Sequence, residues 1–310
     1  MDKKRIVFLG TPGMSAFVLQ GLVNAGFNIV GVITREDKPQ GRKMEMKASK
    51  VGEMADNLHI PCFKPHRLNK EYSFLDDLKP DLLLTFAYGQ IISETVLSYS
   101  KYKPLNLHGS ILPKYRGAAP IQYALKNGET ESGVSLMEMV KAMDAGDVYA
   151  VEKFDISKID NYTSLCEKMQ RAALDVAIKN LPLYFENKLV GEKQDESQVT
   201  FCPSIKKEEE HIPLSLSPEE FVNYVRALAL TPGGYLIWGE EILKIYAAEV
   251  NDSTISGEVG TVIKAAKKDI IIQVTGGTVN LKLLQKPGKK MMGSQDFNNG
   301  THGFEGTLLK

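Results

Sequence analysis

The N-terminal segment constrains the fold more than any other feature, because it holds two apolar runs separated by a glycine turn and an amphipathic stretch. The run RIVFLG at 5–10 is followed by the turn TPG, by MSAFVLQGLVNAG at 14–26, and by NIVGVITR at 28–35. Short apolar runs bounded by turns are typical of buried strands, and the stretch between them is typical of a helix. The segment therefore predicts a strand–helix–strand unit with parallel strands.

Further strand-like runs continue this alternation along the chain. They are IPCF at 60–63, DLLLTFA at 81–87, SGVSLMEM at 132–139 and DVYAVEKFDI at 147–156, and a long helical pattern covers 162–188. Alternating strands and helices favour an α/β fold. We therefore predict a Rossmann-like, doubly wound parallel sheet in a first domain of residues 1–188.

The pattern changes after this domain. Residues 189–208 are polar, have neither strand nor helix periodicity, and are predicted to be a linker. A helical stretch at 217–230 follows, and then short β-like runs separated by glycine-bearing turns. Residues 209–310 are therefore predicted to form a small C-terminal β-barrel domain of the OB-like kind.

Charge and cysteine content argue against binding of polyanions by overall charge, against a cysteine metal site and against a redox dithiol. The 38 basic and 38 acidic side chains cancel, so a polyanion would have to be bound by a local patch. The three cysteines are far apart and form no metal or redox pair, and the remaining histidines have no ligand partners at metal spacing. With no secretory signal or membrane-spanning run, we expect a cytoplasmic, metal-free protein that is a monomer.

The segment PLNLHGSILPKYRGAAPIQ carries the strongest chemical signal. Leu105 and Leu107 alternate with Asn106 and His108 just before a glycine. Period two places Asn106 and His108 on one face of a strand. Because ligands of open parallel sheets bind beyond the carboxyl ends of the strands, both side chains are predicted to face a substrate, with a hydrogen-bonded turn as the alternative.

The first glycine turn, GTPG at 10–13, occupies the position of a dinucleotide fingerprint. Its spacing is not G-x-G-x-x-G, and Pro12 lacks an N–H that a phosphate could accept. We therefore predict no NAD site here, although the turn can still border the active site.

At this point the sequence resembles a known family, the folate-dependent formyltransferases. Their shared core carries Asn, then His two residues later, then a distant Asp in a glycine loop, and Asn106, His108 and Asp144 match that pattern. The similarity extends through AYGQIIS, HGSILPKYRGAAPIQ and MEMVKAMDAGDV to VRALALTPGGYLIW and LLQKPGKKMMGSQDFNNG, over nearly the whole chain. The resemblance implies that these three residues are catalytic.

Formyl transfer explains why these residue types are needed. An amine that attacks a formamide-like carbonyl creates negative charge on oxygen and positive charge on nitrogen. Asn106 and a protonated His108 can donate to the oxyanion, at about 2.7–4 kcal/mol for each donor. Asp144 can hold His108 in its charged form or accept a proton through water, and both roles stay open. The amine is the nucleophile, so no covalent intermediate is required.

The resemblance also implies a folate site. The formyl donor would be 10-formyltetrahydrofolate, without a metal. It would lie along a turn and against a second backbone segment, and the residues concerned are Ser110, Ile111, Leu112 and Pro113 in the turn, and Phe86, Tyr88, Gln90 and Ile91 in the segment. For the turn alone, a purely structural role is the alternative.

A polar, basic loop at 35–47 and a lysine-rich C-terminal domain suggest the second substrate. In the tRNA-formylating members of the family such a loop reaches the acceptor stem, so by resemblance Arg42 and Lys43 would contact initiator methionyl-tRNA. The alternatives are a solvated loop without a ligand, an amino sugar on a nucleotide as the acceptor, and an RNA-binding protein without catalysis.

Overall fold

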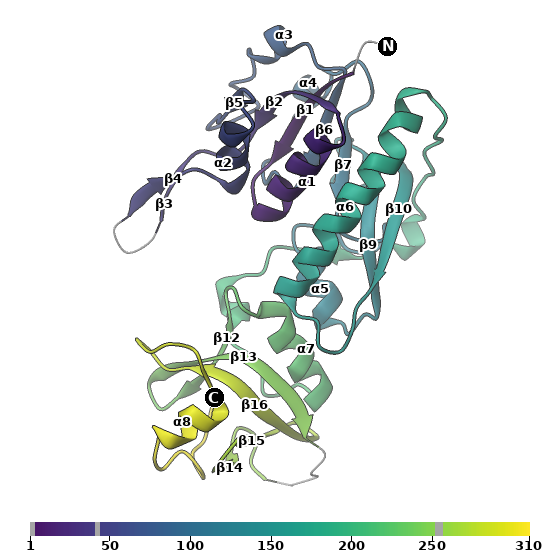
Figure 1. The fold of residues 1–310 in the computed structure, drawn as a ribbon. Helices are drawn as coiled ribbons and strands as arrows, with labels where there is room; N and C mark the ends of the chain where they lie inside the picture. The colour runs from purple at the N-terminus through teal and green to yellow at the C-terminus, as the bar shows by residue number, and fades with distance from the viewer. Residues whose placement is uncertain (1–3, 41–43, 252–256) are drawn as a thin grey trace. The chain divides into compact units, whose positions relative to one another are not determined.

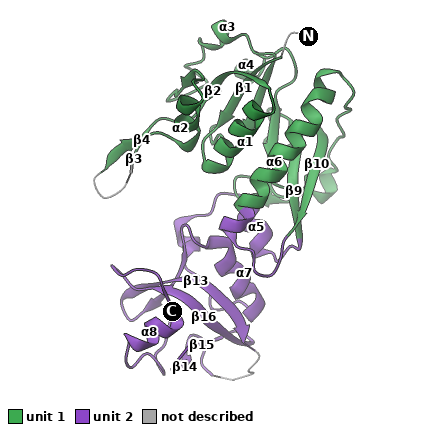
Figure 2. Ribbon diagram, viewed as in Figure 1, with its two compact units in different colours: residues 1–120, 131–155, 166–202 green, residues 121–130, 156–165, 203–310 purple. Residues whose placement is uncertain are grey.

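The computed structural model describes residues 4–40, 44–251 and 257–310, and it divides into two compact units (Figure 2). Unit 1 consists of residues 1–120, 131–155 and 166–202, and unit 2 of residues 121–130, 156–165 and 203–310. Arg42 and Lys43, the predicted tRNA contacts, lie outside the described residues.

Unit 1 is built on a seven-stranded sheet in the order β10-β9-β7-β6-β1-β2-β5 (Figure 1). The strands are β1 (Arg5–Gly10), β2 (Asn28–Ile33), β5 (Cys62–Phe63), β6 (Leu82–Phe86), β7 (Leu105–His108), β9 (Glu131–Glu138) and β10 (Val148–Asp155). Strands β7, β6, β1, β2 and β5 pair in parallel. The predicted strand–helix–strand opening and the largely parallel sheet are confirmed.

Strands β9 and β10 depart from the parallel pattern. β9 is antiparallel to β7, and β10 is antiparallel to β9. Only the loop 139–147 separates β9 from β10. That loop is too short for the crossover of a dozen or more residues that a parallel pair requires, so the chain turns back on itself.

The direction of winding reverses beside β1. From β1 the chain adds β2 and β5 on one side, and it then returns to add β6 and β7 on the other. Gly10 and Phe86 are register partners at the carboxyl ends of β1 and β6. Ligands of doubly wound sheets bind at such a reversal, because the connections leave in opposite directions and open a crevice.

Helices cover the sheet of unit 1. They are α1 (Gly13–Asn24), α2 (Lys50–Asn57), α3 (Leu75–Leu78), α4 (Glu94–Leu97) and most of α6 (Tyr162–Phe185), while only the first residue of α5 (Pro120–Lys126) belongs to unit 1. Helices α1 and α6 are in contact, because a Cβ at Gly21 would overlap Leu174. Val7 and Leu9 of β1 belong to a buried cluster with Leu75 and Val96 of α3 and α4. The loop predicted at 35–47 contains the antiparallel strands β3 (Lys38–Gln40) and β4 (Glu45–Lys47).

The segment predicted to be a linker is divided between the units. It contains the short 3-10 helix η1 (Glu196–Gln198) and the strand β11 (Phe201–Cys202), which pairs in parallel with β8 (Arg116–Gly117). Through this pairing, residues as far as Cys202 belong to unit 1, and unit 2 resumes at Pro203.

Unit 2 is an antiparallel barrel with helices beside it. Its elements are η2 (Lys207–Glu210), α7 (Pro218–Leu228), β12 (Gly234–Trp238), β13 (Glu241–Asn251), β14 (Val262–Ala266), β15 (Asp269–Val274), β16 (Gly277–Gln285), β17 (Met292–Gly293) and α8 (Ser294–Asn299). The strand order is β12-β13-β16-β15-β14, with β17 on β16. Leu309 bridges to Trp238 at one edge and Leu308 to Thr261 at the other, which closes the sheet. The predicted C-terminal β-barrel is confirmed.

Helix α7 joins the barrel to an earlier piece of chain that also belongs to unit 2. Its buried Phe221, Val225 and Leu228 lie in the apolar core with the barrel strands. Its Arg226 donates to the carbonyl oxygens of Asp160 and, at 2.7 Å, of Ser157. These contacts explain why residues 156–165 belong to unit 2. Within the described ranges, we find no helix with the length and apolarity to cross a bilayer.

Candidate active site

Asn106 and His108 lie on β7 as the alternation predicts. Leu105 and Leu107 are buried on one face, while Asn106 is half-buried and His108 is 5% exposed on the other. Gly109 follows directly, so both side chains sit at the carboxyl end of the strand. This is the sheet edge where the winding reversal favours a ligand.

The amide of Asn106 is oriented by the neighbouring strand. Thr85 of β6 is its register partner, and Thr85 Oγ1 donates to Asn106 Oδ1 at 2.7 Å. The threonine hydroxyl has one proton, and by donating it to Oδ1 Thr85 holds the oxygen end of the amide on its own side. The Nδ2 donor of Asn106 is therefore the end directed away from Thr85 and available to a ligand.

The ring of His108 is fixed by a backbone carbonyl. Its Nε2 lies 2.8 Å from the carbonyl oxygen of Tyr115, which can only accept, so Nε2 carries the proton. Nδ1 is then the nitrogen that gains or loses a proton, and it lies 3.5 Å from Asp144 Oδ2. The Nδ1–Oδ2 separation is longer than an ordinary hydrogen bond, but it is short enough for electrostatic attraction when His108 is protonated.

Asp144 lies in the loop 139–147 between β9 and β10. Its backbone has φ of 52°, in the left-handed region that non-glycine residues rarely adopt. Its Oδ2 accepts from the backbone N–H of Gly117 at 2.9 Å. A side chain at Gly146 would overlap the Glu138 carbonyl oxygen, so the loop requires a glycine there. The loop thus brings a carboxylate to His108 from a distant part of the sequence.

The backbone of the predicted folate segment is held by the first glycine turn and its helix. The carbonyl oxygen of Tyr88 accepts from Thr11 Oγ1 at 2.7 Å, and that of Phe86 accepts from Ser15 Oγ. The Gly89 carbonyl oxygen accepts from Arg35 Nη1 at 2.8 Å. The turn therefore borders the site by fixing this segment, a role that its sequence spacing does not reveal.

The side chains of this segment are mostly engaged within unit 1. Tyr88 is 4% exposed in the apolar cluster, and burial raises the pKa of its hydroxyl to about 12. Gln90 accepts from Leu68 N at 3.2 Å, and its amide lies near the carbonyl oxygens of Pro65 and His66. Ile91 is 77% exposed. Ile91 is therefore the exposed side chain among these residues, and the buried Tyr88 hydroxyl has no hydrogen-bond partner among the described residues.

The turn after β7 is stabilised from within. Ser110 Oγ donates to the carbonyl oxygen of Lys114 at 2.6 Å. Ser135 Oγ donates to the Ser110 carbonyl oxygen at 2.7 Å and accepts from Leu112 N at 3.1 Å. The Leu112–Pro113 peptide is cis, and Ile111 is partly exposed. The Ser110 hydroxyl thus closes the turn, in which Leu112 is buried and Ile111 and Pro113 are partly exposed.

The lysines of unit 2 are only partly free. Lys264 pairs with Asp269 at 2.7 Å and Lys282 with Glu249 at 2.6 Å. Lys286 lies over the rings of Trp238 and Phe297, with its ammonium 5.5 and 4.8 Å from their centres. The net basic character of this surface is therefore weaker than its lysine count suggests.

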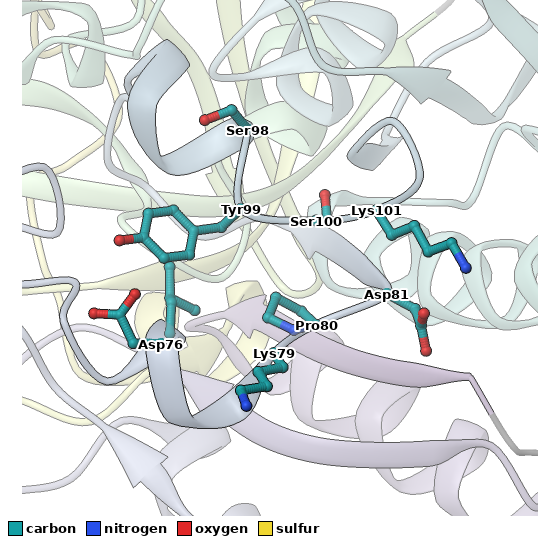
Figure 3. Close-up of a pocket in the computed structure, with 9 residues that line it drawn as sticks. Asp76, Lys79, Pro80, Asp81, Ser98, Tyr99, Ser100 and Lys101 are labelled. Atoms are coloured by element: carbon teal, nitrogen blue, oxygen red, sulfur yellow. The ribbon is translucent and has the colours of Figure 1, made fainter.

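A hollow of the described surface lies apart from the candidate site, and Figure 3 shows the residues that line it. It has a volume of about 470 Å³ and is lined by Leu75, Asp76, Lys79, Pro80, Asp81 and the segment 98–101. Asp81 directly precedes β6, so the hollow lies at the amino end of that strand, opposite Asn106 and His108. The described residues contain no group of three or more side chains able to hold a metal.

Comparison with known proteins gives a consistent result. Residues 4–181 match the formyl transferase family, and residues 204–302 match the formyl transferase C-terminal domain. The methionyl-tRNA formyltransferase of Lactobacillus johnsonii is 39% identical over 95% of both chains. That of Lactobacillus delbrueckii subsp. bulgaricus is 42% identical over 95% of this chain and 94% of its own.

A solved structure supports the fold independently. WlaRD, a sugar 3N-formyl transferase crystallised with dTDP and 5-N-formyl-THF, superposes with a TM-score of 0.67 at 21% identity, over 94% of this chain and 100% of its own. The sequence matches cover both units, and the relatives align over nearly their full length. The chain therefore belongs to the formyl transferase family, in the branch of the methionyl-tRNA formyltransferases.

Proposed function

We propose that this protein transfers the formyl group of 10-formyltetrahydrofolate to the α-amine of methionine on initiator methionyl-tRNA, as a cytoplasmic monomer that supports translation initiation. The observation that carries the proposal is the arrangement of three groups at the carboxyl end of β7. Asn106 directs its amide donor away from Thr85, and His108 Nδ1 lies 3.5 Å from Asp144. The identity of the acceptor is supported by the relatives named methionyl-tRNA formyltransferases.

The reaction needs one bond to form and one to break. The methionine nitrogen attacks the formyl carbon, the carbonyl oxygen becomes an oxyanion, and the bond from the formyl carbon to N10 of the folate then breaks. The attacking amine loses a proton and N10 gains one, so the step balances without an oxidant or a metal. The amine is the nucleophile, and no enzyme side chain is acylated.

The three residues divide the work of this scheme between them. Asn106 Nδ2 donates to the oxyanion, where one such donor contributes about 2.7–4 kcal/mol to transition-state stability. His108 exchanges its proton at Nδ1, because Nε2 is committed to the Tyr115 carbonyl oxygen. Asp144 stabilises the imidazolium through its nearby Oδ2, and its carboxylate, which is 13% exposed, can also pass a proton through water.

The folate is proposed to bind between the turn Ser110–Pro113 and the segment Phe86–Ile91. In the free protein the carbonyl oxygens of Phe86, Tyr88 and Gly89 already accept hydrogen bonds from side chains of unit 1. A backbone held in this way needs little ordering when a heterocycle binds, which lowers the entropic cost of binding. Arg42 and Lys43 are proposed to contact the acceptor stem.

The test is formyl transfer from 10-formyltetrahydrofolate to charged initiator tRNA. A nucleotide-linked amino sugar serves as the competing acceptor, because a sugar-modifying enzyme would use the same donor chemistry. We expect N-formylmethionyl-tRNA as the product and no formylated sugar. Formylation of the sugar alone would overturn the assignment of the acceptor, and loss of both products would overturn formyl transfer itself.

A further inference from the structure

Gln194 joins the segment after α6 to the loop that carries Asp144. Its Nε2 lies 2.8 Å from the carbonyl oxygen of Asp144 and 2.8 Å from that of Gly146. A primary amide has two N–H groups, so it can donate to both carbonyls at once. One side chain therefore fixes the loop backbone on both sides of Ala145.

The Gln194 amide is itself oriented by Arg116. Arg116 Nε donates to Gln194 Oε1 at 3.0 Å, which fixes the side of the amide that carries the donors. The Arg116 side chain is 6% exposed, and its Nη2 lies 2.7 Å from Glu196 Oε1. The largely buried guanidinium is thus held by a carboxylate from the same segment as Gln194.

Arg116 also adjoins the residue that contacts Asp144 directly. The next residue, Gly117, donates its backbone N–H to Asp144 Oδ2. The carboxylate and the backbone of the Asp144 loop are therefore held from two neighbouring points. Because Asp144 has φ of 52°, in the sparsely populated left-handed region, such contacts help to keep it in place.

The same segment supports His108. Thr200 Oγ1 accepts from Tyr115 N at 2.9 Å, and Cys202 Sγ lies 3.0 Å from the Tyr115 carbonyl oxygen, the atom that accepts from His108 Nε2. Residues 194–202 thus touch the supports of both His108 and Asp144. Each of these contacts lies within unit 1.

From these contacts we propose that Gln194 is a positioning residue for formyl transfer, which acts by holding the Asp144 loop, with Arg116 and Glu196 fixing its amide. The proposal rests on the proposed function above. Gln194 does not touch the reacting atoms. It keeps the Asp144 carboxylate at the distance from His108 that the proton transfer needs, and small displacements of catalytic groups cost large factors in rate.

The test measures kcat and KM of the full-length protein with tRNA and folate. We expect Gln194→Ala to lower kcat by about 10- to 100-fold while KM for tRNA changes little. Gln194→Glu should lose activity similarly, because an ionised carboxylate cannot donate to the two carbonyl oxygens. Gln198→Ala is the matched control, since the Gln198 amide lies in the same segment but donates to Asp195. It should keep wild-type kcat.

A double-mutant cycle separates positioning from a general structural role. If Gln194 acts through Asp144, Gln194→Ala should change kcat by less than about twofold on the Asp144→Asn background. Equal factors on both backgrounds, or no loss on either, would overturn the proposal. If the alanine variant loses thermal stability, Gln194→Met replaces it, because methionine keeps the length of the side chain.

Amide hydrogen exchange provides a readout that needs no activity. Gln194→Ala should speed exchange in the peptide that covers residues 140–147, and Gln198→Ala should leave it unchanged. Unchanged protection in Gln194→Ala would contradict the proposal even if kcat falls. If the wild-type protein transfers no formyl group, the proposed function fails while this exchange experiment still tests the contact.

Discussion

Thr85 Oγ1 and Asn106 Oδ1 lie 2.7 Å apart across neighbouring strands, and this hydrogen bond decides which end of the Asn106 amide faces the site. The oxygen is turned toward β6 and the nitrogen away from it. An oxyanion needs a donor, so only this orientation of the amide is useful for formyl transfer. Thr85, which no sequence motif identifies, thus sets the orientation of the Asn106 amide.

Thr85→Val should lower kcat by about tenfold, because the Asn106 amide can then rotate and present its oxygen. Thr85→Ser, which keeps the hydroxyl, should retain most of the activity. Asn106→Ala should cost more, about 100- to 1,000-fold. Steady-state formylation of methionyl-tRNA measures all three variants, and a valine variant as active as the wild type would show that Thr85 has no role in orientation.

His108→Ala should abolish folate-dependent formylation, because it removes the group that exchanges a proton at Nδ1. Binding of tRNA, measured by filter retention, should survive. His66→Ala is the control, since His66 is exposed and pairs with Glu36 instead of the site. Wild-type turnover in His108→Ala would remove His108 from the catalytic machinery.

Arg42→Ala should raise KM for tRNA and leave folate binding unchanged, because a phosphate contact contributes mainly to tRNA affinity. The salt dependence of tRNA binding should also become less steep. Arg171→Ala, at an exposed position of α6, removes the same charge elsewhere. If the two variants lose the same affinity, Arg42 has no specific role.

Low pH should weaken the ion pair between Glu196 and Arg116, and with it the support that Arg116 gives to Gln194. The hydrogen bond from Arg116 lowers the pKa of the Glu196 carboxyl. The ion pair therefore stabilises the folded protein at any pH above the ordinary glutamate pKa of about 4.3. This stabilisation is lost as the pH falls through the lower, folded-state pKa. The difference in melting temperature between wild type and Glu196→Gln should therefore be constant near neutral pH and vanish in acid. A difference that grows as the pH falls would contradict this assignment.

Cys202 should resist alkylation in the folded protein. Burial raises the pKa of its thiol to about 11, so only on the order of a thousandth is thiolate at pH 8. Iodoacetamide followed by mass spectrometry should label Cys202 only after unfolding. Cys202→Ser, which keeps a donor to the Tyr115 carbonyl oxygen, should retain activity. Rapid labelling of the native protein would show that the thiol is accessible.

Much of the fold follows from the sequence. The apolar runs of β1, β2 and β6 are long enough to predict buried parallel strands, and the glycine-separated runs after α7 predict the barrel. The antiparallel direction of β9 and β10 was not predicted, because a strand's periodicity carries no information about its direction. The assignment of residues 156–165 to unit 2 depends on hydrogen bonds from Arg226, which is distant in sequence.

Only part of the candidate site can be predicted from the local sequence pattern. Alternation in β7 places Asn106 and His108 on one face, whereas Asp144 was identified through resemblance. Gln194 could not be predicted, because its partners are backbone carbonyl oxygens, which leave no pattern in the sequence. The strand β11 has two residues, too few for alternation to be visible. Ser110 and Gln90 are predicted from the sequence to bind folate, and in the structure both side chains make hydrogen bonds within the protein.

The pairing of β11 with β8 also bears on how such proteins can be recombined. The first family match ends at residue 181 and the second begins at residue 204. The segment that holds Gln194 and Cys202 therefore lies in neither match. A chimera joined at the edge of the first match would discard the groups that support His108 and Asp144. A functional exchange of C-terminal domains, in evolution or in the laboratory, must therefore place its crossover after Cys202.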